Sequence, residues 1–475
     1  MSKIRTRFAP SPTGLMHLGN IRTALMNYLL AQQKDGTFIL RIEDTDQERN
    51  FDPNGKKIIE DLTWLGLTYD EGPGKAEPYP PYFQSQRLPI YQEKLKELHA
   101  MHFAYRCFCT EEELDRKRER QKALKLPPRY DGTCTKLSEA EATALATTTP
   151  FIWRMKLDPN LSFDINDLAR GSIHFELKNF SDFPLTRQDG SFTFMFANFV
   201  DDLVMKITHV FRGEDHLSNT AGQAAMYAAF KAPLPTFWHM PMLCNIEGKK
   251  LSKRDFGFSL DDLRHAGYLP EALCNYLGII GSGSFKQELM TLEELAQAIN
   301  FDHIGSTGHV RYDVEKLTWV NHKWIDRCEP ERLTELCLPF LISVYPQAAT
   351  TDKAVLTTIL QQIKTDLQTL QDSIRSLAFY FAEPTITRVD ISMQIEPEVL
   401  DEVTAIVAEN LTKIDDAHAF VDAVKNATKQ KGIKLKEIFS FLRLALTGAP
   451  NGPAIHDLIE IMGTEKAKER IKKVL

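Results

Sequence analysis

The first fifty residues alternate between apolar runs and polar turns in a way that predicts a strand, a turn, a helix and a second strand. Ile4 to Ala9 is predicted as a short strand, and the Pro- and Gly-containing stretch from Pro10 to Gly14 as a turn. The apolar positions that follow share one helix face: Ile21, Ala24, Leu25, Tyr28 and Leu29. The strand Phe38 to Ile42 then delivers Glu43 and Asp44 at its carboxyl end, where an open α/β sheet binds ligands.

The middle of the chain interrupts this α/β pattern. Thr110 and Glu113 form a capping-box pattern that opens a charged helix. The apolar runs from Phe192 to Val200 and from Ile207 to Phe211 predict a return to the sheet. We therefore expect an insertion over residues 91–187 that splits one α/β domain.

Helical periodicity dominates the rest of the chain. Ser259 can cap one short helix and Pro270 can open the next, so a small helical module is expected after residue 255. From about residue 330 the apolar spacing is helical almost without interruption, and no strand alternation typical of a β-barrel occurs. The apolar positions of two such helices are Val355, Leu356, Ile359, Leu360, Ile363 and Leu367, then Val399, Leu400, Val403, Ile406 and Val407.

Composition narrows the class of protein. A chain of 475 residues exceeds the size of one hydrophobic core, about 250 to 300 residues, so several domains are expected. No apolar run is long enough for a membrane helix and no signal-type segment occurs, which favours a cytoplasmic enzyme. The net charge of −7 argues against indiscriminate nucleic-acid binding but leaves room for local basic surfaces.

Two short motifs indicate phosphate binding. His17-Leu18-Gly19-Asn20 lies at the expected start of the first helix, where backbone N–H groups and a partial positive charge favour a phosphate. Lys250-Leu-Ser-Lys-Arg254 lies in a polar loop whose lysines can hold departing phosphates as movable charges. Either motif alone is weak, because an isolated histidine usually packs at a turn and a basic pentamer is usually a solvated loop.

As an ordered pair, with the first inside Arg7-Phe-Ala-Pro-Ser-Pro-Thr-Gly14, the two motifs resemble the ATP-binding motifs of class I aminoacyl-tRNA synthetases. The surrounding residues are similar to bacterial-type glutamyl-tRNA synthetases. This resemblance implies an α/β multidomain fold with a class I Rossmann-like catalytic domain. The implied parts are 1–90 (first half of the catalytic domain), 91–187 (acceptor-binding α+β insertion), 188–255 (second half), 256–325 (helical stem-contact module) and 326–475 (all-α anticodon-binding region).

The resemblance also implies substrate-binding residues. For ATP these are His17, Gly19, Asn20, Lys250, Ser252, Lys253 and Arg254, with His17 and Lys253 catalytic. For glutamate they are Arg7, Ala9, Ser11, Glu43, Phe194, Asn198 and Arg212. A guanidinium suits the side-chain carboxylate, whereas Glu43 suits the α-ammonium. The family usually carries a tyrosine at Phe194, so a hydrogen bond worth about 0.5–1.5 kcal/mol is expected to be missing.

The implied reaction joins L-glutamate to tRNA for protein synthesis, through a glutamyl-adenylate that is then transferred to the 3′-terminal adenosine. The expected partners are ATP with Mg²⁺, L-glutamate and tRNA, with glutamate tRNA and possibly glutamine tRNA as substrates. A monomer that does not bind membranes is expected. The basic run from Arg116 to Arg120 is a candidate RNA contact in the insertion, although charge runs are usually solvated helix faces.

Three of the seven cysteines cluster at Cys107, Cys109 and Cys134, a spacing that is not a disulfide framework. Some bacterial members of the family bind zinc at a similar cluster. Here Lys136 occupies the place of the fourth ligand, and a closed zinc site normally needs four. Tyr130 is a poor substitute for that ligand, so the sequence favours three reduced thiols and no metal, and leaves zinc open.

Three alternatives share parts of this pattern. A glutaminyl-tRNA synthetase would carry β-barrels where this C-terminal third is predicted to be helical. The paralogue that glutamylates queuosine in tRNA would lack the anticodon region. A catalytically silent tRNA-binding paralogue would explain Phe194 and Lys136. It would not require the intact residues His17, Lys253, Glu43 and Arg212.

Overall fold

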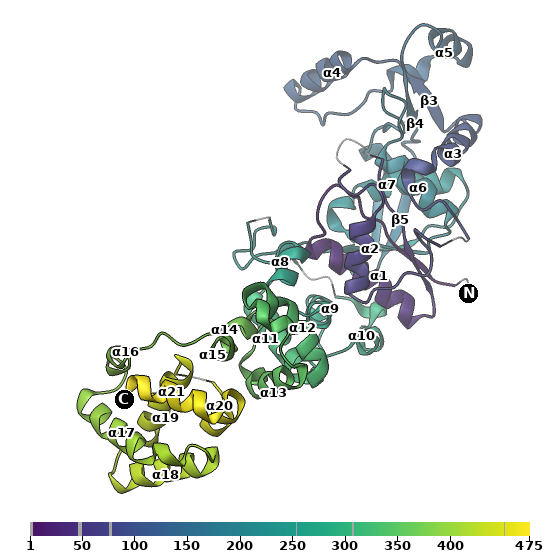
Figure 1. The fold of residues 1–475 in the computed structure, drawn as a ribbon. Coiled ribbons are helices and arrows are strands. Elements are labelled where there is room, and N and C mark those ends of the chain that lie inside the picture. The colour runs from purple at the N-terminus through teal and green to yellow at the C-terminus, as the bar shows by residue number, and fades with distance from the viewer. Residues whose placement is uncertain (1–2, 46–49, 76–77, 253, 306–307, 451) are drawn as a thin grey trace. The chain divides into compact units, whose positions relative to one another are not determined.

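The computed structural model describes residues 3–45, 50–75, 78–252, 254–305, 308–450 and 452–475. Its chain forms two compact units, which are drawn in Figure 1 from purple to yellow along the sequence. The first unit comprises Met1–Asp262 with Pro270–Val314, and the second comprises Leu263–Leu269 with Glu315–Leu475. The finer division into five parts stays a prediction from the sequence.

Two strand–helix–strand units with parallel strands form the centre of the first unit. Their elements are β1 (Arg5–Phe8), α1 (Leu18–Gln33) and β2 (Thr37–Leu40), then β7 (His209–Gly213), α7 (Asn219–Ala229) and β8 (Thr236–Met240). The backbone N–H of Thr208 donates to the carbonyl oxygen of Arg5 at 3.0 Å, which places β7 beside β1. The predicted α/β fold, with its two halves separated in the sequence, is confirmed.

The segment between the two halves contains helices and strands. Its strands are β3 (Ala104–Cys107), β4 (Ile152–Met155), β5 (Ser162–Asp167) and β6 (Gly171–Glu176). β3 pairs antiparallel with β4, and β5 pairs antiparallel with β6. β5 also pairs in parallel with β8, where Asp167 lies opposite Phe237, so a four-stranded sheet has the order β6-β5-β8-β7. The inserted strands thus extend the sheet of the second half.

One predicted strand is a helix. The apolar run from Phe192 to Val200 lies mostly in α6 (Phe194–Val204), and the chain returns to the sheet only at β7. The strand prediction for this run was wrong because a short run that is apolar on every side has no period that separates a buried helix from a buried strand. Seven consecutive residues of α6, from Phe196 to Asp202, are buried, and three of them are polar.

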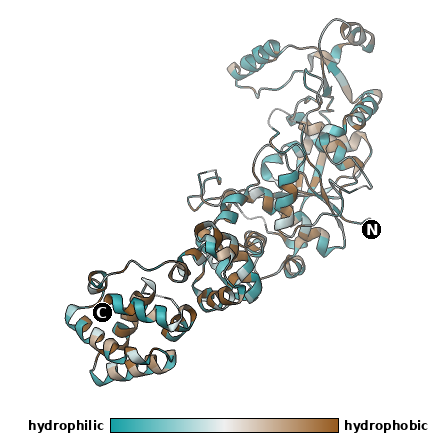
Figure 2. Ribbon diagram, in the orientation of Figure 1, coloured by the Kyte–Doolittle hydropathy of each residue, from teal (hydrophilic) through white to brown (hydrophobic). Residues whose placement is uncertain are grey.

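The remaining elements of the first unit surround this centre. They are α2 (Lys56–Trp64), α3 (Leu88–Ala100), α4 (Glu111–Ala123), α5 (Glu139–Leu145), β9 (Leu243–Cys244), α9 (Pro270–Ile279), α10 (Leu292–Ala298) and β10 (Val310–Arg311), with α8 (Leu260–His265) ending in the second unit. The predicted capping box is present, because Thr110 Oγ1 accepts from the N–H of Glu113 at 3.2 Å. α4 buries no residue and is almost wholly teal in Figure 2.

The second unit is helical, as predicted. Beyond β10 the described residues form no strand, and the helices are α11 (Val314–Arg327), α12 (Pro330–Val344), α13 (Lys353–Ile363), α14 (Asp372–Ser376), α15 (Ala378–Phe381), α16 (Arg388–Ser392), α17 (Pro397–Asn410), α18 (Ala417–Gln430), α19 (Leu435–Thr447), α20 (Ile455–Met462) and α21 (Thr464–Val474). The predicted apolar faces of α13 and α17 are largely buried. Among the described residues, no helix combines the length and hydropathy needed to cross a bilayer.

Candidate active site

A cavity of about 750 Å³ opens at the carboxyl ends of β1 and β7. All seven residues predicted to bind glutamate line it: Arg7, Ala9, Ser11, Glu43, Phe194, Asn198 and Arg212. A second cavity of about 410 Å³ shares His17 and Asn20 with the first and is also lined by Gly19 and Lys250. The predicted amino-acid residues and part of the predicted nucleotide residues are therefore brought together.

His17 is the N-cap of α1. Its Nδ1 accepts hydrogen bonds from the backbone N–H groups of Gly19 and Asn20, at 3.1 and 3.3 Å. Because Nδ1 is an acceptor, the proton of the neutral imidazole lies on Nε2. His17 lines both cavities, so its ring can donate one hydrogen bond to a ligand there.

The surroundings of His17 keep the ring neutral. Burial and the ammonium of Lys250 lower the pKa of His17 below its usual value, and Asp215 opposes them only in part. At neutral pH the side chain therefore donates from Nε2 without adding a positive charge to the cavity.

The segment that follows the second motif is joined to the first motif by backbone hydrogen bonds. The N–H of Leu18 donates to the carbonyl oxygen of Phe258 at 3.1 Å. The N–H of Leu260 donates to the carbonyl oxygen of Met16 at 3.0 Å. The rings of His17 and Phe258 lie 5.2 Å apart. Two motifs more than 200 residues apart in the sequence are thus held side by side.

The described residues of the second motif differ from one another in their surroundings. Lys250 lines the second cavity. The backbone N–H and hydroxyl of Ser252 both donate to Asp255 Oδ2, at 2.8 and 2.9 Å. Arg254 is exposed and lines neither cavity in the described part of the chain. Lys253, which is predicted to be catalytic, lies outside the described residues.

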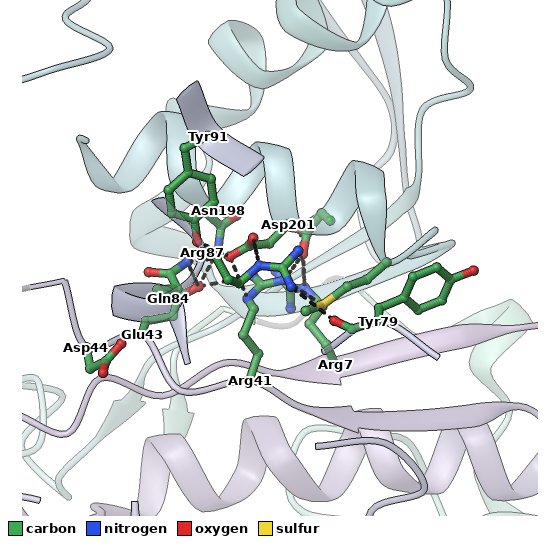
Figure 3. A network of polar contacts seen from close by, with 12 residues as sticks. Arg7, Arg41, Glu43, Asp44, Tyr79, Gln84, Arg87, Tyr91, Asn198 and Asp201 are labelled. Atoms are coloured by element: carbon green, nitrogen blue, oxygen red, sulfur yellow. Dashed lines mark hydrogen bonds and ion pairs between the residues drawn. The ribbon is translucent and has the colours of Figure 1, made fainter. Parts of the chain in front are cut away.

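A buried network of ion pairs forms the floor beneath the amino-acid residues. Figure 3 shows Arg41 rising from the end of β2 among Glu43, Asn198 and Asp201. Arg41 Nη1 lies 2.7 Å from Asp202 Oδ1, and Nη2 lies 3.0 Å from Glu43 Oε1. Burial alone would lower the pKa of Arg41, but the carboxylates of Asp202, Asp201 and Glu43 raise it above its usual value.

The same network includes Arg7 and Arg87. Arg7 Nε lies 3.2 Å from Asp202 Oδ1, and Arg87 Nε donates to Asp201 Oδ1 at 2.6 Å. Its guanidinium groups belong to Arg7, Arg41 and Arg87, and its carboxylates to Glu43, Asp201 and Asp202. Three cations and three anions balance formally. Arg7 therefore has a carboxylate partner in the protein, Asp202, which it shares with Arg41.

The carboxylate of Glu43 is hydrogen-bonded through one of its two oxygens. Oε1 accepts from Asn198 Nδ2 at 2.7 Å and from Arg41 Nη2 at 3.0 Å, and Gln223 Nε2 fixes Asn198 from behind at 3.1 Å. In the described part of the chain, no hydrogen bond reaches Oε2. Burial raises the pKa of Glu43 although these donors act against it. A cation bound beside Oε2 would favour the charged carboxylate.

Arg212 is a buried cation that lines the first cavity. Among the described residues it has no carboxylate partner. Only 6% of its surface is exposed, and its nearest polar contacts are neutral: Thr220 Oγ1 at 2.7 Å and His239 Nε2 at 3.3 Å. Burial and the neighbouring Arg7 lower the pKa of Arg212 to about 9, which still leaves it charged at neutral pH. Such a group is a receptor for a buried anion.

Comparison with protein families identifies the kind of protein to which this cavity belongs. Residues 3–319 match the catalytic domain of class I tRNA synthetases (E and Q), and residues 332–475 match an anticodon binding domain. The chain belongs to the class I tRNA synthetases. Of the two matching domains, the catalytic one contains both cavities.

Individual relatives of this synthetase match along their whole length. The glutamate–tRNA ligase of Natranaerobius thermophilus is 37% identical over 487 residues, covering 100% of this chain and 99% of that protein. The glutamate–tRNA ligase of Clostridioides difficile is also 37% identical, with 99% of each covered. The crystal structure of a glutamate tRNA ligase from Elizabethkingia meningosepticum in complex with its amino acid superposes with a TM-score of 0.87 at 32% identity, covering 99% of each chain. The predicted family and fold class are confirmed.

Phe194 occupies the first position of α6 in this synthetase. Its ring lies 5.3 Å from the ring of His216, and both residues line the first cavity. The phenyl group presents an apolar surface where a tyrosine was expected from the family. The other six residues predicted to bind glutamate also line this cavity, so we expect the departure to affect one contact.

Three cysteines of the synthetase gather between β3 and α5. The Sγ atoms of Cys107, Cys109 and Cys134 lie within 4.8 Å of one another, and those of Cys109 and Cys134 are 3.6 Å apart. The hydroxyl of Tyr130 lies 3.4 Å from Cys107 Sγ and 3.9 Å from Cys109 Sγ. Hydrogen bonding with Cys134 and with Tyr130 lowers the pKa of Cys107 despite burial. None of the seven cysteines forms a disulfide in the structure, and their reduced state stays a prediction from the sequence.

Sequence reasoning missed the buried partners of the site. Arg41 and the pair Asp201-Asp202 stood out only as charges inside apolar runs, and Arg87 and His239 carried no motif. A charge at a position predicted to be buried must be paired, and this rule could have linked Arg41 to the two aspartates. No local signal connects Arg87 or His239 to the cavity, because their partners lie on other elements.

Proposed function

We propose that this chain ligates L-glutamate to tRNA at the cavity between β1 and β7, by the two-step reaction of class I synthetases. The observation that supports glutamate most directly is Arg212, a buried cation without a carboxylate partner among the described residues, in the same cavity as Glu43. An amino acid with a terminal carboxylate offers the anion for Arg212 and an ammonium for Glu43.

The amino acid would be held at both ends. Its side-chain carboxylate accepts hydrogen bonds from Arg212, and its α-ammonium donates to Glu43 Oε2. Arg7 contributes position and shape, since its charge is matched by Asp202. Ala9, Ser11 and Asn198 complete the lining. The α-carboxylate is left free to react with ATP.

In the first step, an oxygen of the glutamate α-carboxylate attacks the α-phosphorus of ATP. A phosphorus–oxygen bond forms to the carboxylate, the bond to the bridging oxygen breaks, and pyrophosphate leaves with the electron pair. The Nε2–H of His17 donates to the phosphoryl oxygens, while Lys250 and, by resemblance, Lys253 balance the charge of pyrophosphate. Asp215 and Asp262 line the cavities and would offer oxygen ligands to the Mg²⁺ that accompanies ATP, which would neutralise phosphate charge.

In the second step, a ribose hydroxyl of the 3′-terminal adenosine of tRNA attacks the activated carbonyl, and AMP leaves. The residues that the structure describes single out no protein base for this proton, and the phosphate of AMP can accept it as the bond breaks. The anticodon binding match over residues 332–475 supports a tRNA substrate. Charging of glutamine tRNA, a monomeric state and a cytoplasmic location stay predictions from the sequence.

The function is tested by aminoacylation with radiolabelled glutamate, Mg-ATP and purified tRNAs specific for glutamate and for glutamine. We expect stable charging of glutamate tRNA. Charging of neither tRNA by folded protein would overturn the proposal and favour a tRNA-binding paralogue. Charging of glutamine tRNA alone would make the chain a specialised paralogue.

We also propose that the cluster of Cys107, Cys109 and Cys134 holds zinc, with the Tyr130 oxygen as the fourth donor. Sulfur atoms around one tetrahedral Zn²⁺ stand about 3.8 Å apart, since each Zn–S bond is about 2.3 Å. The 3.6 Å separation of Cys109 and Cys134 fits this value, whereas Lys136 offers no ligand. Zinc would supply a structural crosslink between the end of β3 and the segment that follows α4, and it would take no part in the reaction.

Zinc content tests this second proposal. The full-length protein purified without chelator is expected to carry about one zinc per chain by mass spectrometry, and Cys109→Ser to lose it, because a closed site needs four donors. Cys328→Ser, at a buried cysteine outside the cluster, is the matched control and should keep the metal. Metal-free protein after growth and purification with added zinc would contradict the proposal.

A further inference from the structure

The guanidinium of Arg212 is held along one edge only. Nε donates to His239 Nε2 at 3.3 Å, and Nη2 donates to Thr220 Oγ1 at 2.7 Å. The face of the guanidinium lies over the ring of Phe237, 5.3 Å from its centroid. In the described part of the chain, Nη1 donates no hydrogen bond, so the edge formed by Nη1 and Nη2 is available to a ligand in the cavity.

His239 is wholly buried and belongs to the strand beside Arg212. The two residues are partners across the parallel pair β7 and β8. His239 Nδ1 lies 2.8 Å from Asp167 Oδ2, and His239 Nε2 lies 2.9 Å from Thr220 Oγ1. Since Nε2 faces the N–H of Arg212 and the hydroxyl of Thr220, it accepts, and the ring proton lies on Nδ1 and is donated to Asp167.

Asp167 fixes this tautomer at the end of β5. Its Oδ1 accepts from the backbone N–H groups of Ala169 and Arg170, at 3.0 and 2.9 Å, and its Oδ2 also accepts from the backbone N–H of His239 at 2.9 Å. The carboxylate is thereby locked and lies one side chain away from Arg212. A neutral imidazole and a neutral hydroxyl separate the two charges.

This arrangement orients a cation without neutralising it. A carboxylate in direct contact with Arg212 would fix the guanidinium equally well, but it would cancel the charge and leave no advantage to an anionic ligand over a neutral amide of the same shape. Arg7 illustrates that case in the same cavity, because Asp202 contacts its Nε directly.

We propose that Thr220 and His239, the latter held by Asp167, are positioning residues that set the specificity of the amino-acid site. They aim the free edge of Arg212 at the side-chain carboxylate of the substrate and preserve its charge by being neutral. This inference rests on the proposed function, since it takes glutamate as the ligand of Arg212. It assigns a role in choosing glutamate over glutamine to residues that line neither cavity.

The test compares Thr220→Val with Thr220→Ser in the full chain, by aminoacylation at saturating ATP and tRNA. Valine removes the hydroxyl that Nη2 contacts, so the KM for glutamate is expected to rise about 10- to 100-fold, the loss of one hydrogen bond to a charged group. Serine keeps the hydroxyl and is expected to stay within about threefold of the unmodified protein. The kcat and the KM for ATP are expected to change little in both variants.

A second pair of variants tests the same positioning role at His239, in case Thr220→Val does not fold. His239→Gln can place an amide oxygen near the position of Nε2, whereas His239→Asn reaches only the position of Nδ1 and leaves Nε of Arg212 without an acceptor. We expect His239→Asn to raise the KM for glutamate more than His239→Gln, and to reduce the preference for glutamate over glutamine. Melting temperatures are measured for all four variants.

The outcomes separate this inference from the proposed function. If the unmodified protein charges no tRNA with glutamate, the proposed function fails. If it does so and Thr220→Val keeps its KM for glutamate, only the positioning role is overturned. Equal changes in kcat and in both KM values would also overturn it, because a merely structural defect acts on all three.

Discussion

Replacing His17 by asparagine is expected to lower kcat for aminoacylation about 100- to 1,000-fold while leaving the melting temperature nearly unchanged. The loss is that of one preorganised donor to a charge that develops in the transition state, about 2.7–4 kcal/mol. The fold is kept because asparagine is itself a good N-cap. Its side-chain oxygen can accept from the N–H groups of Gly19 and Asn20, as Nδ1 of His17 does.

His17→Ala is the matched control for this prediction. Alanine removes both the donor and the cap, so it should lose a similar factor in kcat and in addition about 1 kcal/mol of folding stability. Steady-state kinetics and thermal melts measure the two losses separately. If His17→Asn were as active as the unmodified protein, His17 would be a helix cap with no role in the reaction.

Replacing Arg212 by leucine is expected to raise the KM for glutamate about 100- to 1,000-fold. Without the guanidinium, the side-chain carboxylate of glutamate would be buried with no partner, and truncation of one member of a buried charge pair costs about 2–5 kcal/mol. Glutamine, whose side chain is neutral, should lose much less. The protein itself should not be destabilised, since Arg212 forms no ion pair with the described residues and its removal leaves no carboxylate unpaired.

Arg212→Lys separates charge from geometry in this experiment. Lysine keeps a positive charge but lacks the planar fork, so its KM for glutamate should fall between those of the unmodified protein and Arg212→Leu. The measurement is the KM for both amino acids in aminoacylation. A rise of equal size for glutamate and glutamine in the leucine variant would show that Arg212 shapes the cavity and does not select an anion.

Local features of the site were predictable because they are encoded by neighbours in sequence. A turn followed by a helical face identified the start of α1, and Ser259 was expected to cap the helix after the second motif. The family resemblance supplied the seven amino-acid residues, which do meet in one cavity. These expectations depend on spacing and on residue type, both of which the sequence displays directly.

The buried partners were not predictable in this way. The helix α6 was taken for a strand, although its buried residues include Asn198, which holds Glu43. The contact of Arg212 with His239 joins neighbouring strands that are separated by a whole helix, and nothing within either strand encodes it. Such contacts follow from the topology of the sheet, so they emerge only once the strand order is known.

The charge balance in the floor of the cavity has a consequence for how the protein responds to ionic strength. Counterions in solution screen exposed charges within about 8 Å at physiological ionic strength, but they do not enter a buried set of pairs such as Arg41 with Glu43 and Asp202. The affinity for a polyanion that binds at the surface does depend on salt, since such binding releases counterions. We therefore expect added salt to weaken the binding of tRNA much more than the binding of glutamate.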